Sequence, residues 1–268
     1  MGFKQALNAC AVASDLARQA GALIMGLYRQ DYSIQYKNNN RNDPVTTADK
    51  QANALIVEGL QRAFPEDAIL AEESQDDLAR QKSRRLWCVD PVDGTQEFIA
   101  KNGEFAVMIG LAIDGEARLG VVYQPTVDQL YVGFDQTAYV ENAGIKKPLV
   151  LSNIEDARHA RMMVSRSHPS KRVTAVGERL GLQTSIPHGS IGLKLAVMAR
   201  GDAELYLSYS EYIHEWDTCG PEAILRACGG LVTDVHGDPL RYNKTLPVTT
   251  HGFVCSNGLL HAQILAAL

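Results

Sequence analysis

The chain has few cysteines, and none of them occurs in a metal-binding or redox spacing. Five cysteines are spread over 268 residues, and no two form a Cys-x-x-Cys pair, so neither a zinc site nor a disulfide framework is predicted. Unpaired thiols are typical of a reducing compartment, and we therefore expect a cytoplasmic location. The first residues contain no signal-peptide apolar core and no run reaches transmembrane length, so we expect no membrane partner.

Nucleotide-binding fingerprints are missing as well. The chain has neither a Walker loop nor a Gly-x-Gly-x-x-Gly segment, which counts against the use of a nucleoside triphosphate or a dinucleotide. A formal net charge of −5 argues against nucleic acid as a partner. The basic cluster at residues 80–85 is interpreted as a solvated face or loop. With 46% hydrophobic residues, the chain can bury a substantial core.

The most informative segment that is present reads Asp-Pro-Val-Asp-Gly-Thr at residues 90–95. It follows the apolar run 86–89, which indicates a short buried strand, so both aspartates are expected where a sheet edge opens into a loop. Carboxylates held together repel one another unless a cation joins them. Oxygen ligands without histidine or cysteine suit Mg²⁺ or Mn²⁺. Taken alone, the segment is equally consistent with an ordinary Asp-Gly turn.

Three other segments also place an acid at the start or end of a predicted element. Ala-Glu-Glu-Ser at 71–74 follows the apolar run 68–70, and Trp216-Asp217 opens a predicted helix over 217–228. Asp49 lies in the first turn of a second predicted helix, with Thr47 as its expected N-cap. Each acid singly has an ordinary explanation, as a solvated loop residue or a helix-start carboxylate. Four such segments in one chain point to a shared function of their acids.

In this order the four segments resemble the inositol monophosphatase superfamily, a group of lithium-sensitive, Mg²⁺-dependent phosphomonoesterases. The resemblance runs from about residue 10 to the end and implies an α/β fold, a layered αβαβα sandwich like that of inositol monophosphatase and fructose-1,6-bisphosphatase. It implies two or three Mg²⁺ ions, with Mn²⁺ as a substitute. The implied metal ligands are Glu72, Asp90, the carbonyl of Val92, Asp93 and Asp217. Asp49 and Thr95 resemble the catalytic pair that orients and deprotonates the attacking water.

Within the superfamily, the segments after residues 95, 164 and 215 look most like the 3′(2′),5′-bisphosphate nucleotidases. That resemblance implies hydrolysis of the 3′-phosphate of adenosine 3′,5′-bisphosphate, with 3′-phosphoadenylyl sulfate as a further substrate, in sulfur metabolism. The implied substrate-binding residues are Glu72, Gly94, Thr95, Ser165, His168, Ser190, Lys194 and Asp217. Inositol monophosphatases carry a glutamate seven residues before the Trp-linked aspartate, and this chain has Ser210 there, with Glu211 one place away.

Periodicity outlines the rest of the fold. We expect helices at about 3–30 and 48–64, a hairpin over 105–123 and a strand at 129–134. Beyond residue 148 the pattern alternates, with strands at 162–165, 183–187, 203–207, 230–235 and 252–255 and helices at 170–180, 190–200, 217–228 and the end. We therefore predict one phosphatase unit, residues 1–268, with an α+β half to about 148 and an α/β half from about 149, and the active site between them.

Two alternatives remain open. One is an inositol-1-monophosphatase or another sugar phosphate phosphatase of the same superfamily. The other is a non-catalytic metal-binding regulatory protein, against which the presence of both Asp49 and Thr95 argues. In the main hypothesis the partner is a small phosphorylated molecule, and the protein is a monomer or a homodimer.

Overall fold

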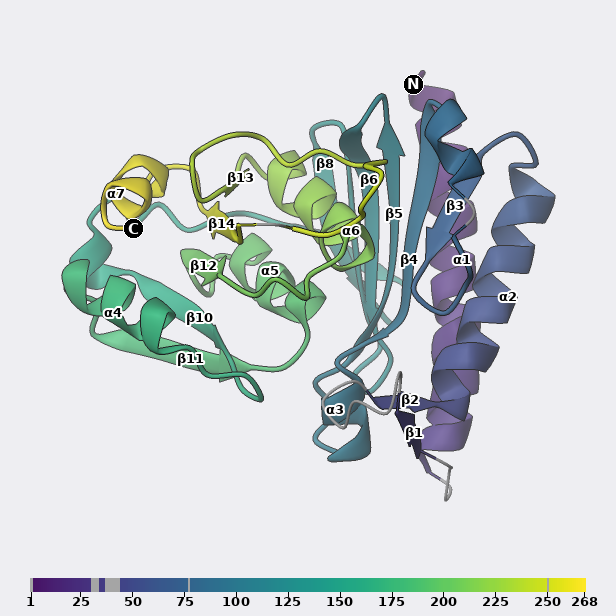
Figure 1. The fold of residues 1–268 in the computed structure, drawn as a ribbon, viewed down its shortest axis with the longest axis horizontal. Coiled ribbons are helices and arrows are strands. Elements are labelled where there is room, and N and C mark those ends of the chain that lie inside the picture. Colours follow the sequence, from purple (N-terminus) through teal and green to yellow (C-terminus); the bar gives the residue numbers. More distant parts are fainter. Residues whose placement is uncertain (1, 30–33, 37–43, 77, 250) are drawn as a thin grey trace.

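Seven α-helices and two large sheets make up the computed structural model, which describes residues 2–29, 34–36, 44–76, 78–249 and 251–268 (Figure 1). The helices are α1 Phe3–Tyr28, α2 Thr47–Ala63, α3 Thr95–Ile99, α4 Lys171–Arg179, α5 Ile191–Ala199, α6 Glu215–Ala227 and α7 His261–Ala266. Two short 3₁₀ helices span Ala79–Lys82 and Ala157–His159. Within the described ranges, none of the helices combines the length and apolar character that a membrane span requires.

The first large sheet has the strand order β3-β4-β5-β6-β7-β8-β9. Its strands are β3 Ala68–Ala71, β4 Arg85–Asp93, β5 Ala106–Ile113, β6 Glu116–Gln124, β7 Gln129–Phe134, β8 Thr137–Asn142 and β9 Ile145–Pro148. All neighbours are antiparallel except β3 and β4, which run parallel. Helices α1 and α2 pack on its outer face through one apolar cluster, and α5 and α6 cover the inner face through another (Figure 1). A small ribbon, β1 Ile34–Tyr36 with β2 Pro44–Thr46, precedes α2.

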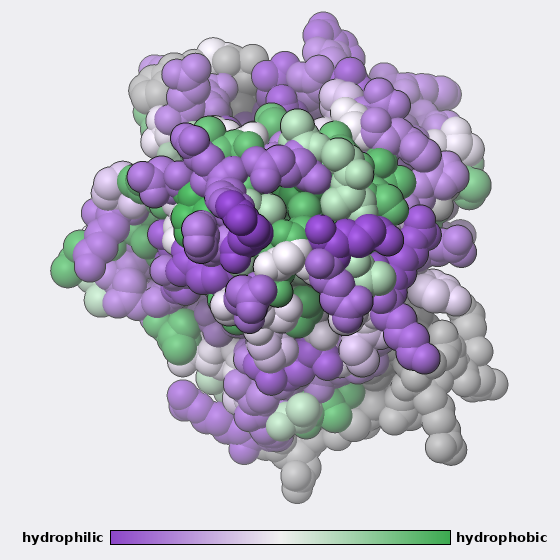
Figure 2. Space-filling model, turned by 90° about the vertical axis from the view of Figure 1, so that its left-hand side faces the viewer, coloured by the Kyte–Doolittle hydropathy of each residue, from purple (hydrophilic) through white to green (hydrophobic). Residues whose placement is uncertain are grey.

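The second sheet has the order β11-β10-β12-β14-β13. Its strands are β10 Arg161–Ser165, β11 Thr184–His188, β12 Leu205–Ser208, β13 Leu231–Asp234 and β14 Phe253–Ser256. Residues of α4 and α7 bury apolar side chains against its outer face. Figure 2, seen from that side, shows mostly hydrophilic side chains around a smaller hydrophobic area. The sequence of layers is therefore helix, sheet, helix, sheet, helix, which confirms the predicted αβαβα sandwich.

Most predicted elements are present, three local predictions are wrong, and two strands were not expected. The N-cap of α2 is Thr46, because its hydroxyl accepts the Ala48 N–H at 3.2 Å, so Thr47 is already helical. Strand β4 continues through the aspartates to Asp93, so they do not lie in a loop. Strands β8 and β9 were not predicted. Arg80 is not solvated, since it is 4% exposed and donates to Asp76 at 2.7 Å. Residue 30, the predicted end of the first helix, lies outside the described residues.

Helix α6 packs against the first sheet through glycines. Gly110, Gly120 and Gly133 are register partners on β5, β6 and β7, and they form a row without side chains across the sheet. A Cβ on Gly120 would lie 1.9 Å from the carbonyl oxygen of Gly220 in α6. One on Gly133 would lie 2.4 Å from the Cα of Ile224. The backbones therefore touch, and the distance between the sheet and α6 depends on this row.

Gly120→Ala tests this contact. The added methyl group meets backbone that cannot rotate away, so we expect a loss of roughly 1–3 kcal/mol in the free energy of unfolding, the usual range for overpacking. Since Asp217 is carried by α6, turnover should fall as well. Denaturant titration and phosphate release measure the two effects. Gly26→Ala in α1, where the new Cβ meets nothing within 4 Å, is the control and should be neutral or stabilising. Unchanged stability of Gly120→Ala would contradict the close packing.

Candidate active site

The segment at residues 90–95 forms the end of β4 and the start of α3. Its register with β5 shifts between Asp90 and Asp93, so the strand is irregular there. The Val92 N–H donates to Oδ1 of Asp90 at 2.9 Å, which holds the carboxylate against the bent backbone. Gly94 follows with φ of 98°, in the left-handed region that favours glycine, and α3 begins at Thr95. The bend thus brings two buried acids and a threonine to one end of the sheet.

Asp93 connects strand β4 to the start of helix α5. Its Oδ2 accepts a hydrogen bond from the Ser190 hydroxyl and another from the Gly192 N–H at 2.7 Å. Both donors belong to the start of α5, where backbone N–H groups have no partner inside the helix. A Cβ on Gly192 would lie 2.5 Å from the sulfur of Met108, so only glycine allows this approach. The sequence indicated Ser190 as a site residue, and the structure joins it to Asp93.

Asp217 and Glu72 approach Asp90 from two further elements. Asp217 lies in the first turn of α6, and its Oδ2 accepts the His214 N–H at 2.6 Å. Glu72 directly follows β3, with its N–H donating to the Val89 carbonyl at 3.1 Å. Burial raises the pKa of Asp90 well above its ordinary value, and the charges of Glu72, Asp93 and Asp217 raise it further. The pKa of Asp217 is also raised, first by burial and then by Glu72.

The chemistry of these acids fits a divalent cation. Four carboxylates repel one another in a place where Asp90 and Asp93 are buried, and a hard cation bound by oxygen ligands would remove that repulsion. Among the described residues, no three acidic, His or Cys side chains are grouped at metal-ligating positions. Asp90, Asp93 and Asp217 each accept a hydrogen bond from a backbone N–H. The acids are still close enough for their charges to raise the pKa values of Asp90 and Asp217.

Buried Asp49 and half-buried Thr95 form a second pair beside these acids. The Thr95 hydroxyl lies 3.2 Å from Oδ1 of Asp49 and 3.2 Å from the Val92 carbonyl oxygen, and it can donate to either. Oδ2 of Asp49 accepts the Thr46 N–H at 2.8 Å and the Thr46 hydroxyl. This capping box explains why Asp49 stands at the start of α2. The sequence predicted that Asp49 and Thr95 act together, and the structure brings them into contact.

Burial raises the pKa of Asp49 to about 6, although the two hydrogen bonds from Thr46 lower it. The negative charges of Glu72 and Glu73 raise it further. A carboxylate with a pKa near the working pH is better suited to accept a proton than an ordinary aspartate is. The pair can therefore orient a hydroxyl or a water and take up a proton.

The predicted substrate-binding residues differ in accessibility. His168 is exposed, its N–H donates to the Ser165 hydroxyl at 3.2 Å, and its ring lies 3.2 Å from the Gln96 side chain. Lys194 is 2% exposed, and its ammonium donates to the His188 carbonyl oxygen at 3.3 Å. Burial lowers the pKa of Lys194 to about 8, against the opposing effect of Asp93. Lys194 thus lies behind the acids, whereas His168 lies at the surface beside α3.

Sequence reasoning missed the contacts that hold these loops together. Arg166 makes two bonds to the carboxylate of Glu104, at 2.6 and 2.7 Å, and a third to the Pro187 carbonyl oxygen at 2.9 Å. The same carboxylate accepts the Gly189 N–H at 2.7 Å, and the Ser167 hydroxyl donates to buried Glu97. Glu104 and Glu97 precede their partners Arg166 and Ser167 by 62 and 70 residues, so no local pattern could pair them. They fix the loops that carry His168 and Ser190.

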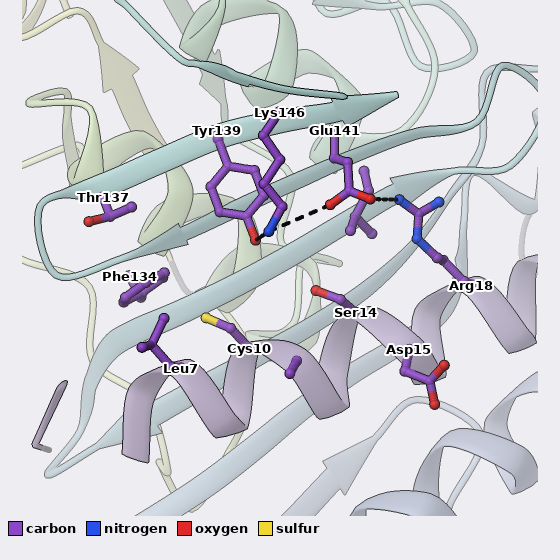
Figure 3. A pocket seen from close by; sticks show the side chains of 12 residues that line it. Leu7, Cys10, Ser14, Asp15, Arg18, Phe134, Thr137, Tyr139, Glu141 and Lys146 are labelled. Carbon is purple, nitrogen blue, oxygen red and sulfur yellow. Dashed lines mark hydrogen bonds and ion pairs between the residues drawn. The ribbon is translucent and has the colours of Figure 1, made fainter. Parts of the chain in front are cut away.

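A hollow of about 550 Å³ lies away from these acids, between α1 and strands β7 to β9 (Figure 3). Its charged side chains are already paired, with Arg18 donating to Asp128 at 2.7 Å and to Glu141 at 2.9 Å. Burial raises the pKa of Cys10 to about 12, so its thiol is a poor nucleophile. None of the candidate site residues lines this hollow, and its chemistry does not make it the active site.

The fold and the acidic site define a phosphoric monoester hydrolase, and the comparison with known families agrees. Residues 7–268 match the inositol monophosphatase family. The chain therefore belongs to this family, whose members are metal-dependent phosphatases.

Individual relatives cover nearly the whole chain. The 3′(2′),5′-bisphosphate nucleotidase CysQ of Salmonella typhimurium is 37% identical over 239 residues, which is 89% of this chain and 95% of that protein. The inositol-1-monophosphatase of Bacillus subtilis is 29% identical and covers 94% of this chain and 93% of its own. The structure of CysQ from Bacteroides thetaiotaomicron, 29% identical, superimposes with a TM-score of 0.79 over 93% of this chain and 97% of that one.

Asp90→Asn tests whether the charge of Asp90 is required for turnover and whether it destabilises the folded protein. The pKa of Asp90 is higher in the folded state than in the unfolded state. Protonation of Asp90 therefore stabilises the fold fully below about pH 4, and this stabilisation is lost as the pH rises through the folded-state pKa. In chelator at pH 8, the variant should therefore melt at a higher temperature than the wild type, and the difference should shrink toward pH 4. Turnover should be abolished. A lower melting temperature at pH 8 would mean that the charge of Asp90 is structural.

Thr46→Ala tests the proton-accepting role of Asp49. Losing the hydroxyl removes a hydrogen bond that lowers the pKa of Asp49, so the acid limb of kcat/KM should move to higher pH. The variant should lose more activity relative to wild type at pH 6 than at pH 8, and about 1 kcal/mol of stability with its N-cap. Thr46→Ser keeps the hydroxyl and should keep the wild-type profile. Parallel profiles for all three proteins would exclude Asp49 as the titrating group.

Proposed function

We propose that the protein is a Mg²⁺-dependent 3′(2′),5′-bisphosphate nucleotidase that hydrolyses the 3′-phosphate of adenosine 3′,5′-bisphosphate, with 3′-phosphoadenylyl sulfate as a further substrate. The observation that carries this proposal is the cluster of four mutually repelling carboxylates, two of them buried, beside the Asp49–Thr95 pair. The similarity to proteins named bisphosphate nucleotidase supports the choice of substrate. The cytoplasmic location and the monomeric or homodimeric state remain predictions.

The proposed metal ligands are the carboxylates of the cluster and one main-chain oxygen, namely Glu72, Asp90, the Val92 carbonyl, Asp93 and Asp217. When bound there, Mg²⁺ or Mn²⁺ polarises a phosphoryl oxygen and lowers the pKa of a water. Two or three ions are expected, because the acids supply more charge than one ion balances. The positive charge of the bound ions also explains how an acidic protein can accept an anionic substrate.

The protein's own groups supply orientation and proton transfer. Thr95 can pass a hydrogen bond from the attacking water to Asp49, and the pKa of Asp49 at about 6 suits it to take up the proton. The N–H groups of Gly94 and Thr95, at the start of α3, are proposed to hold phosphate oxygens. Water attacks phosphorus directly in this scheme, so no covalent intermediate with the protein is required.

The rest of the substrate is proposed to lie between the two halves. Ser165 borders it from the end of β10, His168 from the loop that follows, and Ser190 from the start of α5. Glu72 and Asp217 contact it where it meets the cluster. Lys194 is buried, so we propose that it acts on the phosphate through its charge rather than by direct contact.

An inositol-1-monophosphatase is the second candidate, since a relative with that name is 29% identical. Inositol recognition would need a carboxylate before α6 to bind sugar hydroxyls. Ser210 occupies the expected position, whereas Glu211 is exposed on the neighbouring loop position. This arrangement favours a nucleotide over inositol as the substrate, because the Glu211 carboxylate would have to move to the position of Ser210 to bind sugar hydroxyls.

Phosphate release from three substrates with saturating Mg²⁺ tests the proposal: adenosine 3′,5′-bisphosphate, inositol 1-phosphate and fructose 1,6-bisphosphate. We expect kcat/KM to be about 10–100-fold higher for the nucleotide, as one remote contact of roughly 1.5–3 kcal/mol would produce. Thr95→Ala should lower kcat on the order of 10²–10⁴-fold and serves as the matched inactive protein. A preference for inositol 1-phosphate would establish the second candidate, and no metal-dependent release from any substrate would refute both.

A further inference from the structure

The long segment between β13 and β14 returns from the second sheet to the first (Figure 1). Tyr242, in the middle of this segment, is buried, and its N–H donates to the Gly115 carbonyl oxygen at 3.1 Å in the turn between β5 and β6. Its hydroxyl donates to the carboxylate of Glu222 and lies 3.3 Å from the hydroxyl oxygen of Thr218, and both partners belong to α6. The segment therefore contacts both the first sheet and α6.

A buried acid at the start of α6 binds the same segment. Glu215 is 2% exposed, and its two carboxylate oxygens accept the N–H groups of Asn243 at 2.7 Å and of Lys244 at 3.0 Å. Its own N–H donates to the Pro247 carbonyl oxygen at 2.9 Å. These bonds fix the first turn of α6, which also contains Asp217. The position of Asp217 therefore depends on the segment that carries Asn243.

The Asn243 side chain extends this connection to another part of the chain. Its Oδ1 accepts a hydrogen bond from the Arg80 guanidinium at 3.0 Å. Its Nδ2 donates to the carbonyl oxygens of Arg80 at 3.1 Å and of Ser83 at 3.0 Å. The backbone of Asn243 has φ of 68°, in the left-handed region that asparagine tolerates better than most residues do. Asn243 thus binds α6 through its backbone and residues 80–83 through its side chain.

Arg80 in turn binds the segment that begins with Glu72. Its guanidinium makes three bonds of 2.7–3.0 Å to the carboxylate of Asp76, four residues after Glu72. Hydrogen bonds from Arg80 lower the pKa of Asp76, as expected for an acid that stays charged in this contact. A continuous series of contacts therefore connects the element that carries Asp217 to the segment that carries Glu72. It runs through Glu215, Asn243, Arg80 and Asp76.

We propose that Asn243 is a positioning residue that fixes the spacing between Glu72 and Asp217 and thereby sets the affinity of the site for its metal ion. This inference rests on the proposed function, in which both acids are metal ligands. Their charges repel each other, so the elements that carry them tend to move apart when no ion is bound. The contacts of Asn243 oppose that movement. An ion then binds ligands that are already in place, which lowers the entropy lost on binding.

Asn243→Gly tests the role of the side chain. It removes the three side-chain bonds and keeps the backbone conformation, since glycine adopts positive φ readily. The melting temperature is followed while Mg²⁺ alone is added at constant ionic strength, because an ion that binds only the folded state raises it. The apparent dissociation constant for Mg²⁺ should rise about 10-fold, the lower end of the range for groups that hold metal ligands in place. With saturating Mg²⁺, kcat for adenosine 3′,5′-bisphosphate should return close to the wild-type value.

Asn257→Ala is the matched control. Asn257 is also buried, and its Nδ2 donates to the carbonyl oxygens of Ser152 at 3.2 Å and of Ile154 at 2.9 Å, but it lies at the end of β14 in the second sheet. Both variants should be less stable than wild type in chelator, and only Asn243→Gly should bind Mg²⁺ more weakly.

Asn243→Asp is the conservative variant. It keeps the length of the side chain and the acceptor for Arg80 but loses both donated bonds, so its Mg²⁺ constant should lie between those of wild type and Asn243→Gly. It decides the question if Asn243→Gly does not fold.

The outcomes separate this inference from the proposed function. If the wild type binds Mg²⁺ and both Asn243 variants bind it equally well, the positioning role is refuted and the function stands. An equal rise of the Mg²⁺ constant in Asn257→Ala would show a general loosening of the fold and would also refute the role. If Mg²⁺ neither raises the melting temperature of the wild type nor supports turnover, the proposed function fails and the inference fails with it.

Discussion

Repulsion among buried carboxylates is the constraint on which the rest of this structure depends. Asp90 and Asp93 are less than 10% exposed, and the charges of Glu72 and Asp217 raise the pKa of Asp90 beyond the effect of burial. Asp90, Asp93 and Asp217 each accept a hydrogen bond from a backbone N–H group. Mutual repulsion of such acids costs stability, so stability does not explain why they are grouped. The metal dependence of the family gives a reason for the grouping.

The acids come from different elements, so their spacing depends on how closely those elements pack. Asp90 and Asp93 belong to the first sheet, and Asp217 belongs to α6, which the sheet touches through the backbones of Gly120 and Gly133. With side chains in that row, α6 would be displaced and Asp217 would move away from Asp90. The hydrogen bonds from Ser190 and Gly192 to Asp93 connect α5 to the same sheet. Close packing of these backbones thus determines the distances between the carboxylates.

Much of this arrangement was predictable, because strands and helices have local periods and the four acidic segments have a recognisable order. Features set by distant partners were not. Arg80 lies in a basic run that reads as solvated, yet Asp76 and residues near 243 bury it. Lys194 follows an ordinary helix pattern, and its burial depends on the packing of α5 between two sheets. Thr46 rather than Thr47 caps α2, because the capping box requires Asp49 three residues later. Strand β9 is exposed and most of β8 is only half-buried, and both lack an apolar pattern.

The positive charges divide into two groups with different physical roles. Lys194 is buried behind Asp93, where desolvation lowers its pKa, and its field partly balances the acids without leaving the core. Arg172 is exposed and lies over the ring of Tyr209, so its charge stays in contact with solvent. Exposed charges are screened by salt, whereas buried charges are screened much less. The buried lysine therefore acts on the nearby acids over a wide range of ionic strength, whereas the exposed arginine has an effect only on its immediate surroundings.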